Sequence, residues 1–192
     1  MALSPEALTL IRQWEGCRLS AYPDPASGGA PWTIGYGHTG PEVTAGLTIR
    51  PEQAERWLKD DLAAAEAAVL RLLQPPAGLT QRQREALTSF CFNVGAGALA
   101  ESTLRRRLNG GEPEAQVLQE ELPRWVKGPH GPVAGLVQRR RAELAFARES
   151  SPTIRYGEGG AIELKVPYFA QGDSATAQGE GPGSGWWLDL SC

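Results

Sequence analysis

The sequence predicts an α+β fold that is predominantly helical. Apolar residues recur at three- and four-residue spacing through most of residues 51–148, as on the buried face of a helix. A glycine-rich segment at residues 31–38 alternates bulky and small side chains, as a strand does. After residue 150 the composition changes, which separates this body from a tail of different character.

The chain has 192 residues, a size that suits one domain with an appendage. Residues 1–150 hold 17 of the 19 Lys and Arg and 17 of the 22 Asp and Glu, so this part is neutral. Residues 151–192 are rich in Gly, Ser and Ala and carry the whole net charge of −3. We expect a folded domain over residues 1–150 and a mostly irregular acidic tail over residues 151–192, with one strand-like run at residues 162–166.

The first helix is expected to begin at Pro5, after the capping hydroxyl of Ser4, and to end before Gly16. This places Glu15 in the last helical turn, beside Trp14. A carboxyl group held there is a candidate general acid. A solvated glutamate at a helix end is the alternative.

A second candidate acid, Asp24, stands between two prolines. Pro23 and Pro25 restrict the backbone on both sides of it, so the carboxyl is presented from a stiff, extended segment. Two positioned carboxyl groups are what the hydrolysis of a glycosidic bond requires. The alternative is a turn aspartate that makes local hydrogen bonds.

A β-hairpin is expected next, with its turn at residues 27–29 and a strand over residues 31–38. Alternation places two sets of side chains on opposite faces: Trp32, Ile34, Tyr36 and His38 on one, and Thr33, Gly35 and Gly37 on the other. The second face is almost bare, so a sugar ring fits against the backbone beside the Thr33 hydroxyl. A twisted, bulged strand is the alternative explanation of the glycines.

The rest of the body reads as helices. A helix from Pro51 to about Leu73 spans roughly 33 Å at about 1.5 Å per residue, which is long enough to link two lobes. Thr80 and Gln83 predict a capping box for the next helix. Ser102 is expected to cap a short helix through Leu108, and another helix is expected over residues 114–121. A glycine- and proline-rich loop is expected over residues 128–132, and a last helix over residues 133–148.

Several short segments, taken in order, resemble the phage-type lysozymes, the endolysin muramidases of T-even and lambdoid phages. They are Trp14-Glu15-Gly16, Ala21-Tyr22-Pro23-Asp24, Thr33-Ile34-Gly35-Tyr36-Gly37-His38-Thr39, Ser89-Phe90-Cys91-Phe92-Asn93-Val94-Gly95, Ser102-Thr103-Leu104, Trp125-Val126-Lys127-Gly128 and Gly135-Leu136 followed by Arg139-Arg140 and Glu143. The resemblance covers about residues 4–148. It implies a lysozyme-like fold, in which a small N-terminal β-hairpin lobe and a helical C-terminal lobe are joined by the long helix, with a cleft between them.

The resemblance also implies a catalytic triad of Glu15, Asp24 and Thr33. Eight residues lie between the two acids, as in the family, and eight more lie between Asp24 and Thr33, where the family's usual spacing is shorter. The excess falls in the hairpin tip at Ser27–Pro31. In this scheme Glu15 protonates the leaving oxygen, Asp24 supports the cationic sugar or activates a water, and Thr33 orients that water. Inversion and retention both remain open.

The implied activity is cleavage between N-acetylmuramic acid and N-acetylglucosamine in peptidoglycan, by an endolysin that lyses the host cell. The alternative is a non-catalytic peptidoglycan-binding or phage-particle structural module on the same fold. The presence of all three triad residues favours the enzyme. Nucleic-acid binding through the arginine runs at residues 105–107 and 139–141 is disfavoured, because the body is neutral.

Two further pairs follow from the resemblance. Asn93 and an arginine of the run 139–141, taken as Arg140, are expected to reach the cleft near Glu15 and bind substrate. A solvated helix face is the alternative for the arginines. His38 and Asp61 are expected to form a structural ion pair between the hairpin and the long helix, and a hydrogen-bonded, partly buried histidine is the alternative.

No metal or cofactor is expected. The three cysteines, Cys17, Cys91 and Cys192, have neither the even number of a disulfide framework nor the spacing of a zinc site. The N-terminus lacks the basic and apolar regions of a signal peptide, and no stretch approaches the roughly 18 apolar residues of a membrane span. We therefore expect a monomer that stays in the cytoplasm until another protein releases it to the cell wall, its partner being peptidoglycan.

Overall fold

A computed structural model of the chain describes residues 3–23, 28–75, 78–128, 131–149, 154–156 and 162–164. The chain divides into two units, Met1–Arg148 and Glu149–Cys192. In the second unit the described residues form two antiparallel strands, β6 (Ile154–Tyr156) and β7 (Ile162–Leu164). β7 lies within the strand-like run predicted at residues 162–166, and β6 was not predicted. The other residues of the predicted tail lie outside the described residues.

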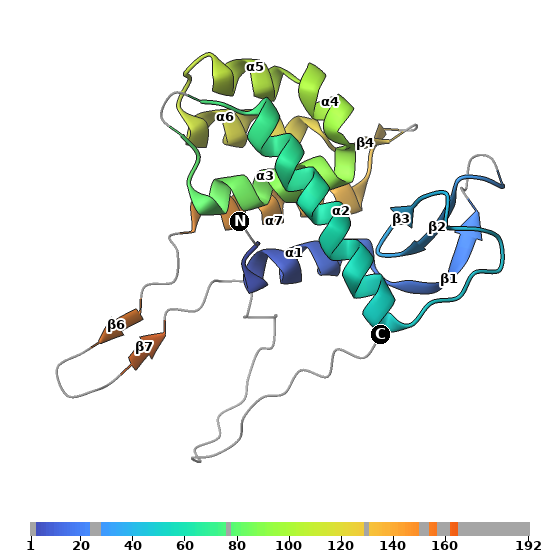
Figure 1. Cartoon of the computed structure of the whole chain (residues 1–192). Helices are drawn as coiled ribbons and strands as arrows, with labels where there is room; N and C mark the ends of the chain where they lie inside the picture. Colours follow the sequence, from blue (N-terminus) through green and yellow to red (C-terminus); the bar gives the residue numbers. More distant parts are fainter. Residues whose placement is uncertain are drawn as a thin grey trace. The chain divides into compact units, whose positions relative to one another are not determined.

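The first unit confirms the predicted fold class, since it is mainly helical with small antiparallel sheets. Its elements in chain order are α1 (Pro5–Glu15), β1 (Arg18–Pro23), β2 (Trp32–Gly35), β3 (His38–Thr39), α2 (Pro51–Leu72), α3 (Gln81–Val94), α4 (Ala96–Glu101), α5 (Thr103–Asn109), α6 (Glu114–Glu121), the 3-10 helix η1 (Leu122–Arg124), β4 (Lys127–Gly128), β5 (Gly131–Pro132) and α7 (Ala134–Arg148). Figure 1 shows the three N-terminal strands beside one end of α2 and helices α4, α5 and α6 beside the other.

Helix α1 starts and stops as the sequence predicts. The Ser4 hydroxyl oxygen accepts a hydrogen bond from the backbone N–H of Ala7 at 3.2 Å, and Pro5 occupies the first helical position. Gly16 ends the helix with φ of +63°, a conformation that favours glycine. Glu15 is therefore the last residue of the helix, where the chain leaves towards the sheet.

The N-terminal sheet has the strand order β1-β2-β3, with both pairs antiparallel. The predicted single strand over residues 31–38 is wrong, because a tight turn at Tyr36 and Gly37 divides it into β2 and β3. Gly37 has φ of +90°. The predicted bare glycine face also needs correction. Gly35 is buried against Ala54 of α2, and its φ of +62° is a conformation that favours glycine.

Helix α2 joins two hydrophobic cores. Its first half supplies Ala54, Leu58 and Leu62 to a small core that also contains Ile11 and Tyr36. Its second half contributes to a larger core among the helices of the C-terminal lobe. The α2 residues of that larger core are Ala65, Ala68 and Val69. The apolar stripe of one helix thus holds the sheet on one side and the helical lobe on the other, as the length of the segment predicts.

The C-terminal lobe follows the predicted helices closely. Both bonds of the capping box form, since the Thr80 oxygen accepts from the Gln83 N–H at 3.2 Å and the Gln83 side chain accepts from the Thr80 N–H at 2.9 Å. Ser102 caps α5 as expected. Helix α4 was not predicted, and the loop expected at residues 128–132 contains parts of β4 and β5.

Within the described residues, no helix has the length and apolarity needed to cross a membrane.

Candidate active site

Glu15 lines an open cavity of about 360 Å³ between the sheet and the helical lobe. Its side chain is 17% exposed, so water reaches it. The cavity is lined by residues from α1, the β2–β3 turn, β3, α2 and α3, namely Glu15, Tyr36, Gly37, Thr39, Asp61, Phe92 and Asn93. A carboxyl group at the end of α1 is therefore presented to a solvent-filled hollow where the two lobes meet.

Thr33 does not itself line this cavity, but it is paired with a residue that does. Thr33 on β2 lies directly opposite Thr39 on β3, and directly opposed residues on neighbouring strands project to the same face. Thr39 lines the cavity. The β2–β3 turn comes close to the acid as well, because a Cβ built on Gly37 would lie 3.8 Å from the Glu15 Oε2 atom.

The third predicted catalytic residue, Asp24, lies outside the described residues. Strand β1 ends at Pro23, the residue before it. Pro23 is paired with Trp32, and Tyr22 is paired with Thr33.

An arginine of α7 contacts Glu15, but it is Arg139 and not the predicted Arg140. The Arg139 Nη1 atom donates to the Glu15 Oε1 atom at 2.6 Å. Arg140 is only 1% exposed and does not line the cavity, so its predicted role in binding substrate stays a prediction. The alternative of a solvated helix face fails for both residues, since Arg139 is 3% exposed.

The two arginines are held by a buried glutamate on their own helix. Glu143 is 0% exposed, and its Oε1 atom accepts from Arg139 Nε at 3.2 Å and from Arg140 Nη2 at 3.0 Å. Burial raises the pKa of Glu143, whereas the charges of Arg140 and Arg139 oppose that rise. Burial likewise lowers the pKa of Arg140. This ion-pair cluster joins α7 to the residue at the end of α1.

Asn93 lies where it was predicted, in the lining of the cavity beside Glu15. Its Oδ1 atom accepts a hydrogen bond from Arg140 Nη2 at 3.0 Å. An arginine has donors only, so the amide oxygen must face Arg140 and the amide NH₂ group is turned away from it. Arg140 thus acts behind Asn93 and does not itself enter the cavity.

The contact expected between His38 and Asp61 is present. His38 Nδ1 lies 2.8 Å from Asp61 Oδ2, which ties β3 to α2. Two features were not predicted: His38 Nε2 lies 2.6 Å from Glu42 Oε1, and the imidazole stacks on Trp57 with ring centroids 4.5 Å apart. Burial lowers the pKa of His38, but the hydrogen bonds and charges of Glu42 and Asp61 outweigh it and raise the pKa overall.

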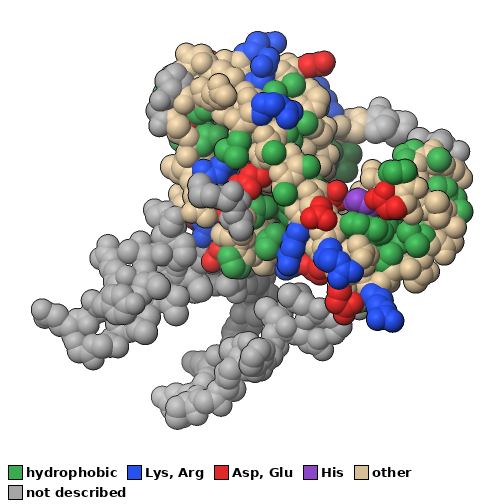
Figure 2. Space-filling model, viewed as in Figure 1, with side chains coloured by type: hydrophobic (Ala, Val, Ile, Leu, Met, Phe, Trp, Pro, Cys, Tyr) green, Lys and Arg blue, Asp and Glu red, His purple; other side chains and the backbone are tan. Residues whose placement is uncertain are grey.

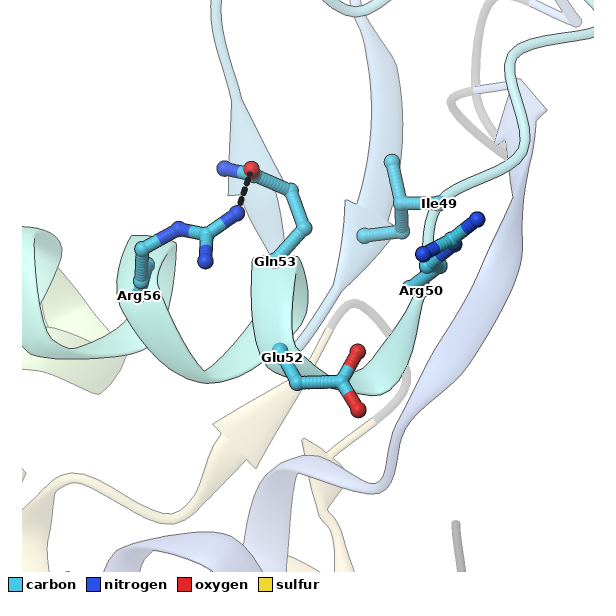
Figure 3. A pocket seen from close by; sticks show the side chains of 5 residues that line it. All are labelled: Ile49, Arg50, Glu52, Gln53 and Arg56. Atoms are coloured by element: carbon cyan, nitrogen blue, oxygen red, sulfur yellow. Dashed lines mark hydrogen bonds between the residues drawn. The ribbon is translucent and has the colours of Figure 1, made fainter.

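A second hollow, of about 460 Å³, lies on the first turns of α2 (Figure 3). It is lined by Ile49, Arg50, Glu52, Gln53 and Arg56. Arg56 Nη2 donates to Gln53 Oε1 at 2.5 Å, and Figure 3 shows Glu52 on the opposite side of the helix turn from Gln53. None of these residues lines the cavity around Glu15, so the two hollows are separate.

The sequence did not distinguish three of the residues that surround Glu15. Arg139 stands in a run of three arginines, and nothing in the run marks which one faces the acid. Thr39 and Tyr36 become cavity residues only because the chain turns between them. Over the part of the chain that the structure describes, no group of three His, Cys, Asp or Glu side chains is arranged to hold a metal ion.

Comparison with known proteins agrees with this geometry. The family model described as phage lysozyme matches residues 12–143. Among curated proteins, the endolysin of Acyrthosiphon pisum secondary endosymbiont phage 1 is 39% identical over 150 residues, which cover 76% of this chain and 97% of that protein. The endolysin of Salmonella phage P22 is also 39% identical over 150 residues, covering 76% of this chain and 98% of the relative.

Two solved structures have the same fold. The muramidase domain of SpmX from Asticaccaulis excentricus is 33% identical with a TM-score of 0.68, and the alignment covers 77% of this chain and 98% of that domain. A mutant of P22 lysozyme is 37% identical with a TM-score of 0.63, and the alignment covers 78% and 99% of the two chains. The family match spans more than half of the sequence, and the similarity to the two endolysins named above extends along nearly their whole length. This chain belongs to the phage lysozyme family.

Proposed function

We propose that this protein is a lysozyme that cleaves the bond between N-acetylmuramic acid and N-acetylglucosamine in peptidoglycan, and that it serves as a phage endolysin in lysis of the host cell. Membership of the phage lysozyme family and the endolysins and muramidase domain among its relatives support this activity. The observation that carries the proposal is the placement of Glu15, a partly exposed acid at the end of α1, in the cavity between the two lobes.

In this proposal Glu15 is the general acid. Arg139 engages its Oε1 atom, and the Oε2 atom lies on the side of Gly37. The proton for the leaving oxygen is therefore carried on Oε2. Asp24 supports the cationic sugar or activates the attacking water, and Thr33 orients that water from the sheet face that it shares with Thr39. The anomer of the product reports the carboxyl separation, since retention requires about 5–5.5 Å and inversion about 6.5–9.5 Å.

Mass analysis of the fragments released from purified peptidoglycan tests the proposal. We expect muropeptides that end at N-acetylmuramic acid, and we expect Glu15→Gln to lower the rate about 10²- to 10⁴-fold, because the glutamine amide is too weak an acid to protonate the leaving oxygen. Glu52→Gln is the matched control, since Glu52 lines the second hollow. If the wild type binds peptidoglycan but releases no more fragments than Glu15→Gln, the protein is a binding module and not an enzyme.

We further infer that the protein acts as a monomer without affinity for nucleic acid, and stays in the cytoplasm until another protein releases it to the wall. The arginines support the second point, because many are paired internally. Arg107 bonds to Glu112, Glu120 and Glu121, and Arg139 and Arg140 are buried. Figure 2 shows acidic and basic side chains lying close together over the lower half of α2. Sedimentation analysis tests the monomeric state, and a DNA-retention assay tests the lack of affinity for nucleic acid.

A further inference from the structure

Two cavity residues, Glu15 and Asn93, are each held by one of two neighbouring arginines, and both arginines bind the same buried glutamate. We propose that Glu143 is a positioning residue that sets the places of both Glu15 and Asn93. It does so through two arms, the side chains of Arg139 and Arg140. The inference rests on the proposed function, because it takes Glu15 as the acid and the cavity as the substrate site.

The first arm, Arg139, has a fixed orientation. Its Nη1 donates to Glu15 Oε1 at 2.6 Å, its Nε to Glu143 Oε1 at 3.2 Å and its Nη2 to the backbone oxygen of Ser89 at 3.1 Å. The guanidinium is planar and rigid, so three bonds to three separate groups leave it one position. Glu15, which ends α1 and is followed by a glycine, thereby takes its place from α7.

The second arm, Arg140, reaches the cavity wall. Its Nη2 donates to Asn93 Oδ1 at 3.0 Å, its Nε lies 2.9 Å from Glu143 Oε2, and its guanidinium lies 4.9 Å from the ring centre of Phe90. The Asn93 oxygen is therefore held towards α7, and the amide NH₂ is left to donate to an acceptor in the cavity. An N-acetyl carbonyl oxygen of the glycan has the chemistry that this donor requires.

Glu143 connects the arms. Besides the two arginines, its Oε1 accepts from the Ser89 hydroxyl at 2.8 Å, and the side chain is 0% exposed. Glu143 is thus the buried side chain that Arg139 and Arg140 have in common. If Glu143 loses its negative charge, both buried arginines lose this shared partner, and both arms are free to shift.

The test separates the arms by their kinetic effects on a soluble glycan fragment. Arg139→Lys keeps the charge but cannot make three directed bonds, so we expect kcat to fall about ten- to hundredfold with little change in KM. Arg140→Lys releases Asn93, so we expect a similar rise in KM with little change in kcat. Glu143→Gln should show both effects. Glu121→Gln is the matched control, because Glu121 is also buried, also binds two arginines and lies on α6, away from the cavity.

Circular dichroism at the assay temperature establishes that each variant is folded. The proposal is overturned if Arg139→Lys and Arg140→Lys both keep the wild-type kcat and KM. It is also overturned if the changes in kcat and KM of both lysine variants are no different from those of the control Glu121→Gln. Should Glu143→Gln fail to fold, the two lysine variants carry the test: Arg139→Lys must change mainly kcat, and Arg140→Lys must change mainly KM. Activity retained by Glu15→Gln would overturn the proposed function instead, whereas an inactive Glu15→Gln with unchanged lysine variants would overturn only the positioning role.

Discussion

The imidazole of His38 shows how one side chain can join two elements through several kinds of contact. Its Nδ1 atom contacts Asp61 of α2, and its Nε2 atom contacts Glu42 of the loop that follows β3. Trp57 of α2 stacks on the imidazole ring. His38 itself is paired with Ile34 in the sheet. The sheet is thus connected to α2 by charge and by ring contact, in addition to the small apolar core.

This arrangement makes the stability of the protein depend on pH. The pKa of His38 is raised in the folded state, so protonation stabilises the fold. The stability gained from protonated His38 is fully present below its unfolded-state pKa of about 6.5. It is lost as the pH rises through the higher pKa of His38 in the folded state. We expect the free energy of unfolding of the wild type to exceed that of Asp61→Asn by more at about pH 5.5 than at about pH 8.5, measured by urea denaturation.

Asp60→Asn is the control for this experiment, because Asp60 is the exposed neighbour on α2. Its effect on the free energy of unfolding should be the same at both pH values. A difference between wild type and Asp61→Asn that does not change with pH would show that the ion pair does not act on the His38 proton.

At the scale of single elements, the helix starts differ in how far their caps reach. The Thr80 cap of α3 is local, since its capping box is closed within four residues by Gln83. The Ser4 cap of α1 extends further, because its hydroxyl and its N–H both donate to Glu85 of α3, at 2.9 and 2.7 Å. Glu85 is 2% exposed, so these bonds satisfy a buried carboxylate.

We therefore expect the two caps to differ in energy. Thr80→Ala should lower the free energy of unfolding by about 1 kcal/mol, the usual effect of losing a cap. Ser4→Ala should lower it by about 2 kcal/mol, because it also removes a bond to a buried charge. Urea denaturation measures both. Equal losses in the two variants would mean that the hydroxyl of Ser4 contributes nothing through Glu85.

At the scale of the whole first unit, α2 connects two cores of unequal size. The core beneath the sheet consists of Ile11, Tyr36, Ala54, Leu58 and Leu62. The core of the C-terminal lobe takes buried side chains from α1 to α7, among them Leu87 and Phe90. The cavity with Glu15 lies where the smaller and the larger core meet, so motion of the sheet would change the shape of the cavity.

The unequal cores predict unequal local stability. We expect native-state hydrogen exchange to be faster at the amides of β2 than at those of α3, because fewer buried apolar contacts hold the sheet. Leu58→Ala should speed exchange in β2 more than in α3, and Leu87→Ala should do the reverse. Equal protection of β2 and α3, changed equally by both variants, would mean that the unit unfolds as one cooperative body.

The sequence by itself determined the class of fold, the main helices and the position of the candidate acid. These are local properties: a serine or threonine before a proline or a polar turn starts a helix, a glycine stops one, and the spacing of apolar residues gives the buried face. Glu15 was found because Gly16 ends α1, and α2 was found because its apolar stripe continues until the prolines after Leu73. The pairing of His38 with Asp61 came from the resemblance to a family.

The tertiary structure decided which of several equivalent residues meet. Arg139, Arg140 and Arg141 are identical in the sequence, and only the packing of α7 against α1 and α3 selects Arg139 for Glu15 and Arg140 for Asn93. The pairing of Thr39 with Thr33 across the turn at Tyr36 and Gly37 likewise became visible only in the structure. Contacts between residues far apart in the chain depend on the register and the rotation of packed elements, and no local pattern encodes these.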